Sequence, residues 1–264
     1  MFATPLRSTA TTSVAAPLPS ADPLAPTPVE VPDLPPLQGS LFGLAGADLP
    51  IATSDLSSKL HRTVVRHQLD PCCWVDVVQN WFGGADDLLV TLLDRLTWTC
   101  GRRLMYGTFH DEPRLSATSH VEDPQLPVLV RDMADALSTH YLADRPDSAR
   151  CSRGAQGPSA HHRFDAIFCN YYRDGNDSVA WHADRVGRRQ VDPFVAIACL
   201  GGPRPFRVRP MSGGASTSFM LGSGDLLVMG GAMQHHWEHA VPKVRHAPPR
   251  MSVTLRSGPG AERA

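Results

Sequence analysis

The stretch SVAWHADR, residues 178–185, places two side chains that can bind a metal ion two positions apart, His182 and Asp184. Successive side chains of a β-strand point to opposite faces, so residues two apart share a face. An imidazole and a carboxylate on one face suit a divalent metal ion. The alternative for an isolated H-x-D pair is a charged pair at the surface, so a metal site needs a third ligand from elsewhere in the chain.

The stretch MQHHWEHAVPK offers three candidates for that ligand, His235, His236 and His239. Two histidines and one carboxylate cap one face of an octahedral ion and leave the other positions open, as in non-haem Fe(II) oxygenases. Zinc more often takes a third histidine or a cysteine. The residue types therefore favour iron and leave the choice among the three histidines open.

A second run, RMSVTLR, carries Arg250 and Arg256 six positions apart, with Ser252 and Thr254 between them on the same strand face. Guanidinium groups on a strand with a core-like pattern are costly unless each meets an anion, and their planar forks match carboxylates. A dicarboxylate would satisfy both arginines. The alternative is a solvated edge strand with two exposed arginines.

The run NYYRDG adds Asn170 and Tyr172, which are again two apart. They offer an amide and a phenol to a ligand on one strand face. Packing in the core is the alternative role for such a tyrosine.

The elements that must position these residues follow from the apolar periodicity. DDLLVTLLDRLTW and LVRDMADALSTHYL place apolar side chains at helical spacing and predict two amphipathic helices. From about residue 163 the chain consists of eight short β-like runs separated by Gly, Pro and Asp clusters. This order predicts a mainly β protein with flanking helices, a sandwich or jelly roll whose N-terminal helices pack on one sheet.

Composition sets the remaining bounds. Ten of the 24 prolines lie in the first 50 residues, where apolar residues do not recur periodically, so we expect a disordered tail over 1–50 and one domain over 51–260. Lys plus Arg number 25 against 26 Asp plus Glu, so nucleic acid binding would need local basic patches.

No apolar run approaches the roughly 18 residues of a membrane span. Six cysteines without a C-x-x-C pair favour reduced thiols, and we expect a cytoplasmic monomer without membrane contact.

Taken together, four blocks of the sequence resemble the AlkB family of Fe(II)- and 2-oxoglutarate-dependent dioxygenases, which repair alkylated nucleic acid bases. The blocks are NYYRDGNDSVAWHAD, FVAIACLGGPRPFRVR, GDLLVMGGAMQHHWEHAVPK and RMSVTLR, in the family's order between about residues 165 and 257. MYGTFHDEPRL, from residue 105, is a weaker match. The resemblance implies a double-stranded β-helix, or jelly-roll, fold.

The resemblance implies that His182, Asp184 and His239 form the catalytic iron site. His239 is chosen because it alone stands before AVPK, as in the family's W-x-H-x-V-P-K. The other two histidines would then lie next to the site or at the surface.

The resemblance also implies a 2-oxoglutarate site. Asn170 and Tyr172 match the family's N-x-Y, which touches this cofactor, and Arg250 and Arg256 match its R-x-x-x-x-x-R. Arg250 would pair with the distal carboxylate and Arg256 would lie near the carboxylate and keto end. Ser252 stands where the family often has Asn.

The activity implied is oxidative removal of N-alkyl groups from 1-methyladenine or 3-methylcytosine in DNA or RNA, consuming O2 and releasing formaldehyde, succinate and CO2. The damaged base must also leave the stack, which costs a few kcal/mol. Two departures fall on the substrate side. Members commonly continue the iron motif as H-x-D-D-E, with an acid that reads the base, whereas Arg185 and Val186 follow here. After PRL, the stacking aromatics are replaced by residues 116–119, SATS, with His120 the nearest ring.

Because stacking is worth about 1–3 kcal/mol per base, these departures should alter substrate choice more than iron or cofactor binding. The resemblance places the basic loop RVGRR at the mouth of the pocket, where arginines can grip phosphates. We expect substrate contacts from these residues: Met105, Tyr106, Arg114, Trp181, Arg185 and Arg188.

Two other classes of function remain open. One is a 2-oxoglutarate-dependent hydroxylase or demethylase of a protein or small molecule. The other is a non-catalytic jelly roll that binds nucleic acid and uses its metal structurally. Retention of the two-arginine strand disfavours the latter, because a structural ion needs no 2-oxoglutarate.

A short motif in the predicted tail suggests a protein partner. QGSLFG, at residues 38–43, resembles the Q-x-x-L-F peptide with which bacterial replication and repair proteins bind the sliding clamp. The peptide from Gln38 to Phe42 would then be presented by the tail. The alternative is that Leu41 and Phe42 pack on the domain.

Overall fold

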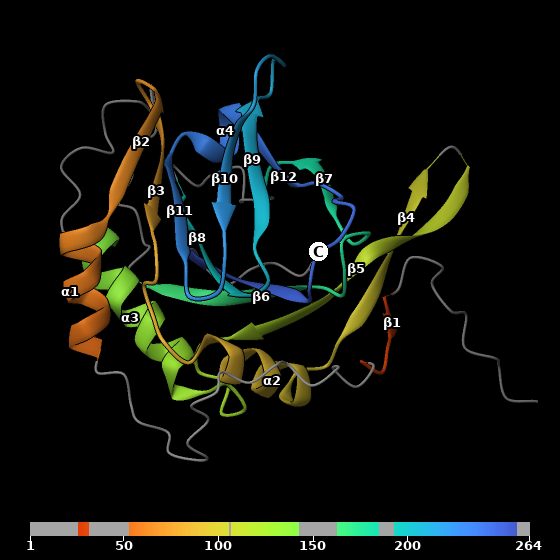
Figure 1. The fold of residues 1–264 in the computed structure, drawn as a ribbon, viewed down its shortest axis with the longest axis horizontal. Helices are drawn as coiled ribbons and strands as arrows, with labels where there is room; N and C mark the ends of the chain where they lie inside the picture. Colours follow the sequence, from red (N-terminus) through yellow and green to blue (C-terminus); the bar gives the residue numbers. More distant parts are fainter. Residues whose placement is uncertain (1–25, 32–52, 106, 143–162, 185–192, 258–264) are drawn as a thin grey trace, which may run out of the picture.

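The computed structural model describes residues 26–31, 53–105, 107–142, 163–184 and 193–257. Within these ranges the chain forms two antiparallel sheets that face each other, with helices on the outer side of the larger sheet (Figure 1). This is a mainly β double-stranded β-helix, so the predicted fold class is confirmed.

The larger sheet has nine strands, and the strands of its centre are buried on both faces. Its order is β1 (Thr27–Pro28), β4 (Thr99–Met105), β5 (Thr108–His120), β6 (Phe164–Tyr172), β13 (Arg250–Ser257), β8 (Val195–Gly201), β11 (Leu226–Gly231), β3 (Cys73–Val78) and β2 (Val65–Asp70). β8 is buried from Val195 to Leu200, which explains its continuous apolar sequence VAIACL.

The smaller sheet has the order β10 (Thr217–Leu221), β9 (Arg204–Pro210), β12 (Trp237–Val241) and β7 (Val179–His182). Ile197 and Cys199 of the larger sheet share a buried cluster with Phe206, Val208 and Val241 of the smaller sheet. The two sheets are therefore packed face to face, and any cavity between them is lined by the inward positions of both.

The helices cover the outer face of the larger sheet. They are α1 (Thr53–Thr63), α2 (Ala85–Arg95) and α3 (Val128–Leu142), while the short α4 (Met233–His236) links β11 to β12. Leu89 of α2 and Leu137 of α3 belong to one buried cluster with Met251, Val253 and Leu255 of β13. Odd-numbered positions of β13 thus face the helices, and its even-numbered positions face the smaller sheet.

The two predicted helices correspond to α2 and α3, and the eight predicted β-like runs to β6 through β13. The structure adds α1, α4 and the strands β1 to β5, so the larger sheet draws five of its nine strands from the N-terminal part of the chain.

Most of the predicted 1–50 tail, with the peptide from Gln38 to Phe42, lies outside the described residues. Within residues 26–31, β1 pairs with β4, and the Val29 amide donates to the Trp98 carbonyl at 3.0 Å. Cys100, Cys169 and Cys199 are free thiols, whereas Cys72 is disulfide-bonded, so the expectation of reduced thiols is wrong at that residue. None of the described helices is long and apolar enough to cross a membrane.

Candidate active site

Three potential metal ligands meet where the smaller sheet faces the larger one. One ligand atom from each of His182, Asp184 and His239 can be chosen so that all three lie within 4.8 Å of one another. β7 pairs with β12 so that His182 stands opposite His239, and their ring centroids are 4.2 Å apart. Asp184 follows two residues after His182, just beyond the end of β7. The strand pairing therefore brings two residues together that are far apart in the sequence.

Hydrogen bonds orient two of these side chains. Nδ1 of His182 lies 2.9 Å from the Ala180 carbonyl. Because a carbonyl oxygen only accepts, Nδ1 carries the hydrogen and Nε2 keeps a lone pair for a metal ion. The Asp184 carboxylate accepts a hydrogen bond from Nη2 of Arg256 at 2.5 Å, and the Asp184 amide donates to the Gln234 side chain at 2.9 Å.

His239 is held in its uncharged form. Burial lowers the pKa of His239 to about 4. The neighbouring His182 and Arg256 also lower this pKa, whereas Asp184 raises it. The imidazole packs on the Phe206 ring, with centroids 5.3 Å apart. A neutral imidazole is the form that binds a metal ion, so this environment suits a ligand.

His235 and His236, the other two candidates, lie on α4 and are exposed. Within the described residues, the only group of three or more His, Cys, Asp or Glu side chains close enough to share an ion is the one containing His239.

The predicted cofactor residues lie on the two neighbouring strands β6 and β13. Their register sets Arg250 opposite Tyr172 and Ser252 opposite Asn170. The even-numbered positions of both strands point toward the smaller sheet. As a result, Asn170, Tyr172, Arg250, Ser252 and Arg256 all line one cavity of about 680 Å³ together with the three potential metal ligands.

Arg250 and Arg256 have buried N–H donors without a hydrogen-bond partner among the described residues. Arg250 is 1% exposed, and its Nε and Nη1 have no partner among the described residues, while Nη2 lies 3.2 Å from the Cys199 sulfur. Nε of Arg256 is likewise buried without a partner. Burial of unpaired guanidinium groups is costly. A small dicarboxylate bound in the cavity would satisfy them, so the residues fit the cofactor that the sequence implies.

Of the predicted substrate contacts, Arg114 lies in the cavity wall. Its Nε donates to the Asn170 side chain at 2.7 Å, and its Nη2 forms an ion pair with Glu112 at 2.9 Å. Trp181 is not in the cavity wall, and the Arg209 guanidinium lies 4.1 Å from its ring centroid. Met105 ends β4, with its side chain outside the described parts. Tyr106, Arg185 and Arg188 lie outside the described residues.

The structure adds wall residues that the sequence analysis did not assign, among them Arg103, Glu112, Thr118 and Ser119. Glu112 matters most, because it is a second carboxylate in the cavity besides Asp184. β5 thus contributes a carboxylate to the cavity wall. The even spacing of Glu112, Arg114, Thr118 and His120 was a signal that could have placed them on one face of β5.

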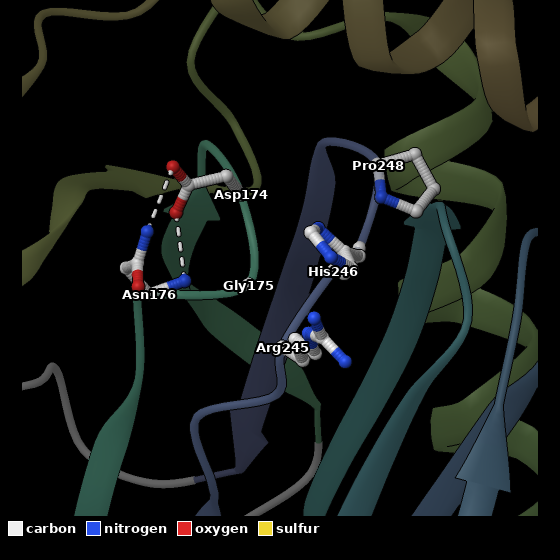
Figure 2. A pocket seen from close by; sticks show the side chains of 7 residues that line it. Asp174, Gly175, Asn176, Arg245, His246 and Pro248 are labelled. Carbon is white, nitrogen blue, oxygen red and sulfur yellow. Dashed lines mark hydrogen bonds between the residues drawn. The ribbon is translucent and has the colours of Figure 1, made fainter.

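A second, smaller hollow of about 320 Å³ lies between two loops and shares no lining residue with the first. Figure 2 shows the loop that follows β6, in which Asp174 is hydrogen-bonded to Asn176, across from Arg245 and His246. The Val244 amide donates to the Gly175 carbonyl at 2.9 Å. A Cβ atom on Gly175 would approach the Val244 carbonyl oxygen to 2.3 Å, so glycine allows the two loops to meet.

Comparison with known proteins agrees with this geometry. Residues 100–258, more than half of the chain, match the family described as the 2OG-Fe(II) oxygenase superfamily. The protein belongs to this superfamily of Fe(II)- and 2-oxoglutarate-dependent dioxygenases, and the cluster of His182, Asp184 and His239 is the triad that would hold its iron.

Its relatives include AlkB homologues. It is 38% identical over 106 residues to mouse "Alpha-ketoglutarate-dependent dioxygenase alkB homolog 3", covering 36% of this chain and 37% of that protein. It is 30% identical over 118 residues to Arabidopsis thaliana "DNA oxidative demethylase ALKBH2", covering 36% and 38%. The match thus spans little more than a third of these relatives. A prolyl hydroxylase structure from Trichoplax adhaerens aligns with a TM-score of 0.47 at 10% identity, over 78% of this chain and 88% of that chain.

Proposed function

We propose that this protein is an oxidative demethylase that removes N-alkyl groups from damaged nucleic acid bases of the 1-methyladenine and 3-methylcytosine type. The observation that carries the proposal is the single cavity lined by the metal triad, the two arginines of β13 and a further carboxylate, Glu112. The names of the mouse and Arabidopsis relatives support the same class of substrate.

The roles of the residues follow from their positions. His182, Asp184 and His239 would hold Fe(II), and Arg250 with Tyr172 would bind the distal carboxylate of 2-oxoglutarate. Arg256 would lie at the keto end, where its hydrogen bond to Asp184 links the cofactor site to the metal site. With O2, Fe(II) and 2-oxoglutarate supply the oxidation of the N-methyl carbon. Hydroxylation there leaves a hemiaminal, which releases formaldehyde and the repaired base.

Glu112 would favour a positively charged base. Methylation at N1 of adenine or N3 of cytosine makes the base a cation, whereas 3-methylthymine is neutral. A carboxylate in the cavity wall attracts the cation most strongly where water is scarce. The ion pair with Arg114 holds Glu112 in place and is itself tied to Asn170 of β6.

One assay tests the proposal. Protein loaded anaerobically with Fe(II) is given 2-oxoglutarate, air and a panel of methylated oligonucleotides, and succinate and formaldehyde are measured. We expect both products in equal amounts from oligonucleotides that carry 1-methyladenine or 3-methylcytosine. Succinate without formaldehyde would favour a protein or small-molecule substrate, and neither product would favour the non-catalytic jelly roll.

Two variants control the assay. Asp184→Ala should abolish both products while the far-ultraviolet circular dichroism spectrum is retained, because the change removes a metal ligand at the end of a strand. His236→Ala changes an exposed histidine of the same segment and should leave turnover unchanged. Turnover by the Asp184 variant would reject the iron assignment.

The proposal places this activity in residues 51–260, and cytoplasmic localisation stays a prediction.

Clamp binding by Gln38 to Phe42 also stays a prediction, which a pull-down with the sliding clamp and a Phe42→Ala variant tests. Loss of capture in that variant is expected if the peptide binds the clamp.

A further inference from the structure

Arg204, the first residue of β9, is a fully buried arginine that neither the metal triad nor the cofactor strand accounts for. Its Nη1 donates to the Asp174 carbonyl at 2.9 Å, and its Nη2 donates to the carbonyls of Asp177 at 2.8 Å and Pro242 at 2.7 Å. Its Nε is buried without a partner in the described parts of the chain. Through these bonds Arg204 joins the loop that follows β6 to the segment that follows β12.

The charge of Arg204 is not neutralised by an ion pair. No described carboxylate lies within ion-pair distance of its guanidinium group, and the carboxylate of Asp177 is bound instead by Arg173, at 2.8 Å. Carbonyl groups satisfy N–H donors and leave the net positive charge in place. The carboxylates of Asp177 and Asp174 act on this charge only from beyond ion-pair distance. Burial of a cation without an ion-paired acid is costly, so a further anion nearby would stabilise it.

A second buried cation, Arg250, lies over the same aromatic ring as Arg204, that of Tyr172. The guanidinium carbons of Arg204 and Arg250 are 5.7 Å and 5.3 Å from the centroid of the Tyr172 ring. Neither arginine forms an ion pair with a described acid. Burial lowers the pKa of Arg204 and the charge of Arg250 lowers it further, while Tyr172, Asp177 and Asp174 raise it by smaller amounts. Two cations that repel each other around one phenol make this end of the cavity strongly attractive to an anion.

We infer that Arg204 is a positioning residue for the distal carboxylate of 2-oxoglutarate. Together with Arg250 it makes the Tyr172 end of the cavity doubly cationic, and this charge selects dicarboxylic over monocarboxylic 2-oxo acids. Arg250 contacts the carboxylate, and Arg204 acts from behind through its electrostatic field. The inference rests on the proposed function, which assigns the distal carboxylate to Arg250.

The test compares two ligands that differ only at the distal end. 2-Oxopentanoate has the carbon chain of 2-oxoglutarate with a methyl group in place of the distal carboxylate. Both are titrated by calorimetry into protein loaded with Mn(II) under nitrogen, so that binding is measured without turnover. The quantity of interest is the selectivity ratio, the dissociation constant of 2-oxopentanoate divided by that of 2-oxoglutarate.

Arg204→Gln should lower the selectivity ratio about tenfold, because it removes one charge–charge attraction that acts through the protein interior. The affinity for 2-oxopentanoate should stay within about twofold, because that ligand has no distal charge for the guanidinium group to attract. Arg207→Gln is the matched control. It removes an exposed arginine three positions further along β9 and should leave the ratio unchanged.

A purely structural role would give another result. If Arg204 only holds the loops, Arg204→Gln weakens both ligands in parallel and the ratio stays constant, which overturns the inference. If the Gln variant does not fold, the selectivity ratio of Arg204→Lys is measured instead, because lysine keeps the positive charge and lacks the planar guanidinium group. A ratio kept within about threefold supports the inference, and a tenfold loss despite the retained charge overturns it.

The proposed function has a separate point of failure. Arg250→Gln should reduce the ratio at least as much as the Arg204 variant. If Arg250→Gln leaves it unchanged, the assignment of the distal carboxylate fails. If only the Arg204 variant leaves it unchanged, the proposed function stands and the inference alone is wrong.

Discussion

Asp184 connects the metal site to the cofactor site through a single hydrogen bond. Arg256 donates to its Oδ1 at 2.5 Å, which leaves Oδ2 for a metal ion. Only 7% of the Asp184 side chain is exposed, so water cannot easily replace the guanidinium group as a partner. The orientation of the metal-binding carboxylate therefore depends on a residue from the cofactor strand β13.

This dependence can be measured without 2-oxoglutarate. Arg256→Gln should weaken Mn(II) binding about 10- to 100-fold, the usual cost of removing a partner that orients a metal ligand. Electron paramagnetic resonance titration of free Mn(II) gives the affinity. Arg209→Gln, which removes an arginine outside the cavity wall, should leave it unchanged. Equal affinities in the Arg256 variant and the parent protein would show that Asp184 needs no such support.

Glu112 provides a test of how the lesion is chosen. Glu112→Gln should lower kcat/KM for a 3-methylcytosine oligonucleotide about tenfold and change that for neutral 3-methylthymine by less than about twofold, because only the former base is a cation. Both rates are followed as formaldehyde release. The control is Glu122→Gln, which changes a surface acid paired with Arg163. Equal losses on the two lesions would mean that Glu112 serves only to hold Arg114.

The alternation of side chains along strands explains what could be predicted at this scale. It places His182 with Asp184 and Arg250 with Arg256 from the sequence alone, because the positions in each pair differ by an even number. The same rule directs Trp181 away from His182, and its ring indeed lies by Arg209 outside the cavity. This rule could not predict that β7 pairs with β12, because strand pairing depends on the whole sheet.

At the scale of elements, the packing of α1 on α3 contains a group that responds to acid. His140 of α3 has a buried Nδ1 without a described partner, and its ring lies 4.7 Å from that of His61 of α1. Burial lowers the pKa of His140 below its ordinary value of 6.5, and the proximity of His61 adds to the effect. The folded protein therefore binds this proton less readily than the unfolded chain does.

The sign of the pH effect follows by linkage. Below pH 6.5 the unfolded state takes up a proton that the folded state resists, so the free energy of unfolding falls as the pH drops from 6.5 toward the lowered pKa of His140. His140→Gln should reduce this loss, measured as the change in urea midpoint between pH 7 and pH 5. His120→Gln, at an exposed histidine, should not. An identical pH dependence in the His140 variant would contradict the assignment.

The N-terminal strands show why some elements were missed. β4 reads TCGRRLM, and β5 includes Pro113 and several charged residues, so neither has the apolar alternation of a half-buried strand. β5 nevertheless pairs with β6 from Leu115 to His120. Such strands are selected by their neighbours in the sheet more than by their own propensity. The runs from β6 onward were found because their apolar residues face two buried layers.

At the scale of the whole molecule, both sheets line the cavity, with β6 and β13 supplying part of one wall and β7 and β12 part of the other. A metal ion and a cofactor bound there connect the sheets in the folded state and have no such site in the unfolded chain. Ligands that bind only the folded state stabilise it by mass action. The stability of the entire domain should therefore report on occupancy of this one site.

N-oxalylglycine, a dicarboxylate shaped like 2-oxoglutarate, should raise the melting temperature of the Mn(II)-loaded protein by about 5–10 °C when it is present at about 100 times its dissociation constant. This follows from about 2.7 kcal/mol of stabilisation and about 2–4 °C per kcal/mol for a domain of this size. Differential scanning calorimetry measures the shift, and excess chelator should reverse it. In the Asp184→Ala variant the shift should be absent, because that carboxylate is one of the three metal ligands and also orients Arg256 of the cofactor site. An equal shift in the variant would place the ligands elsewhere and remove the physical basis for a common site between the two sheets.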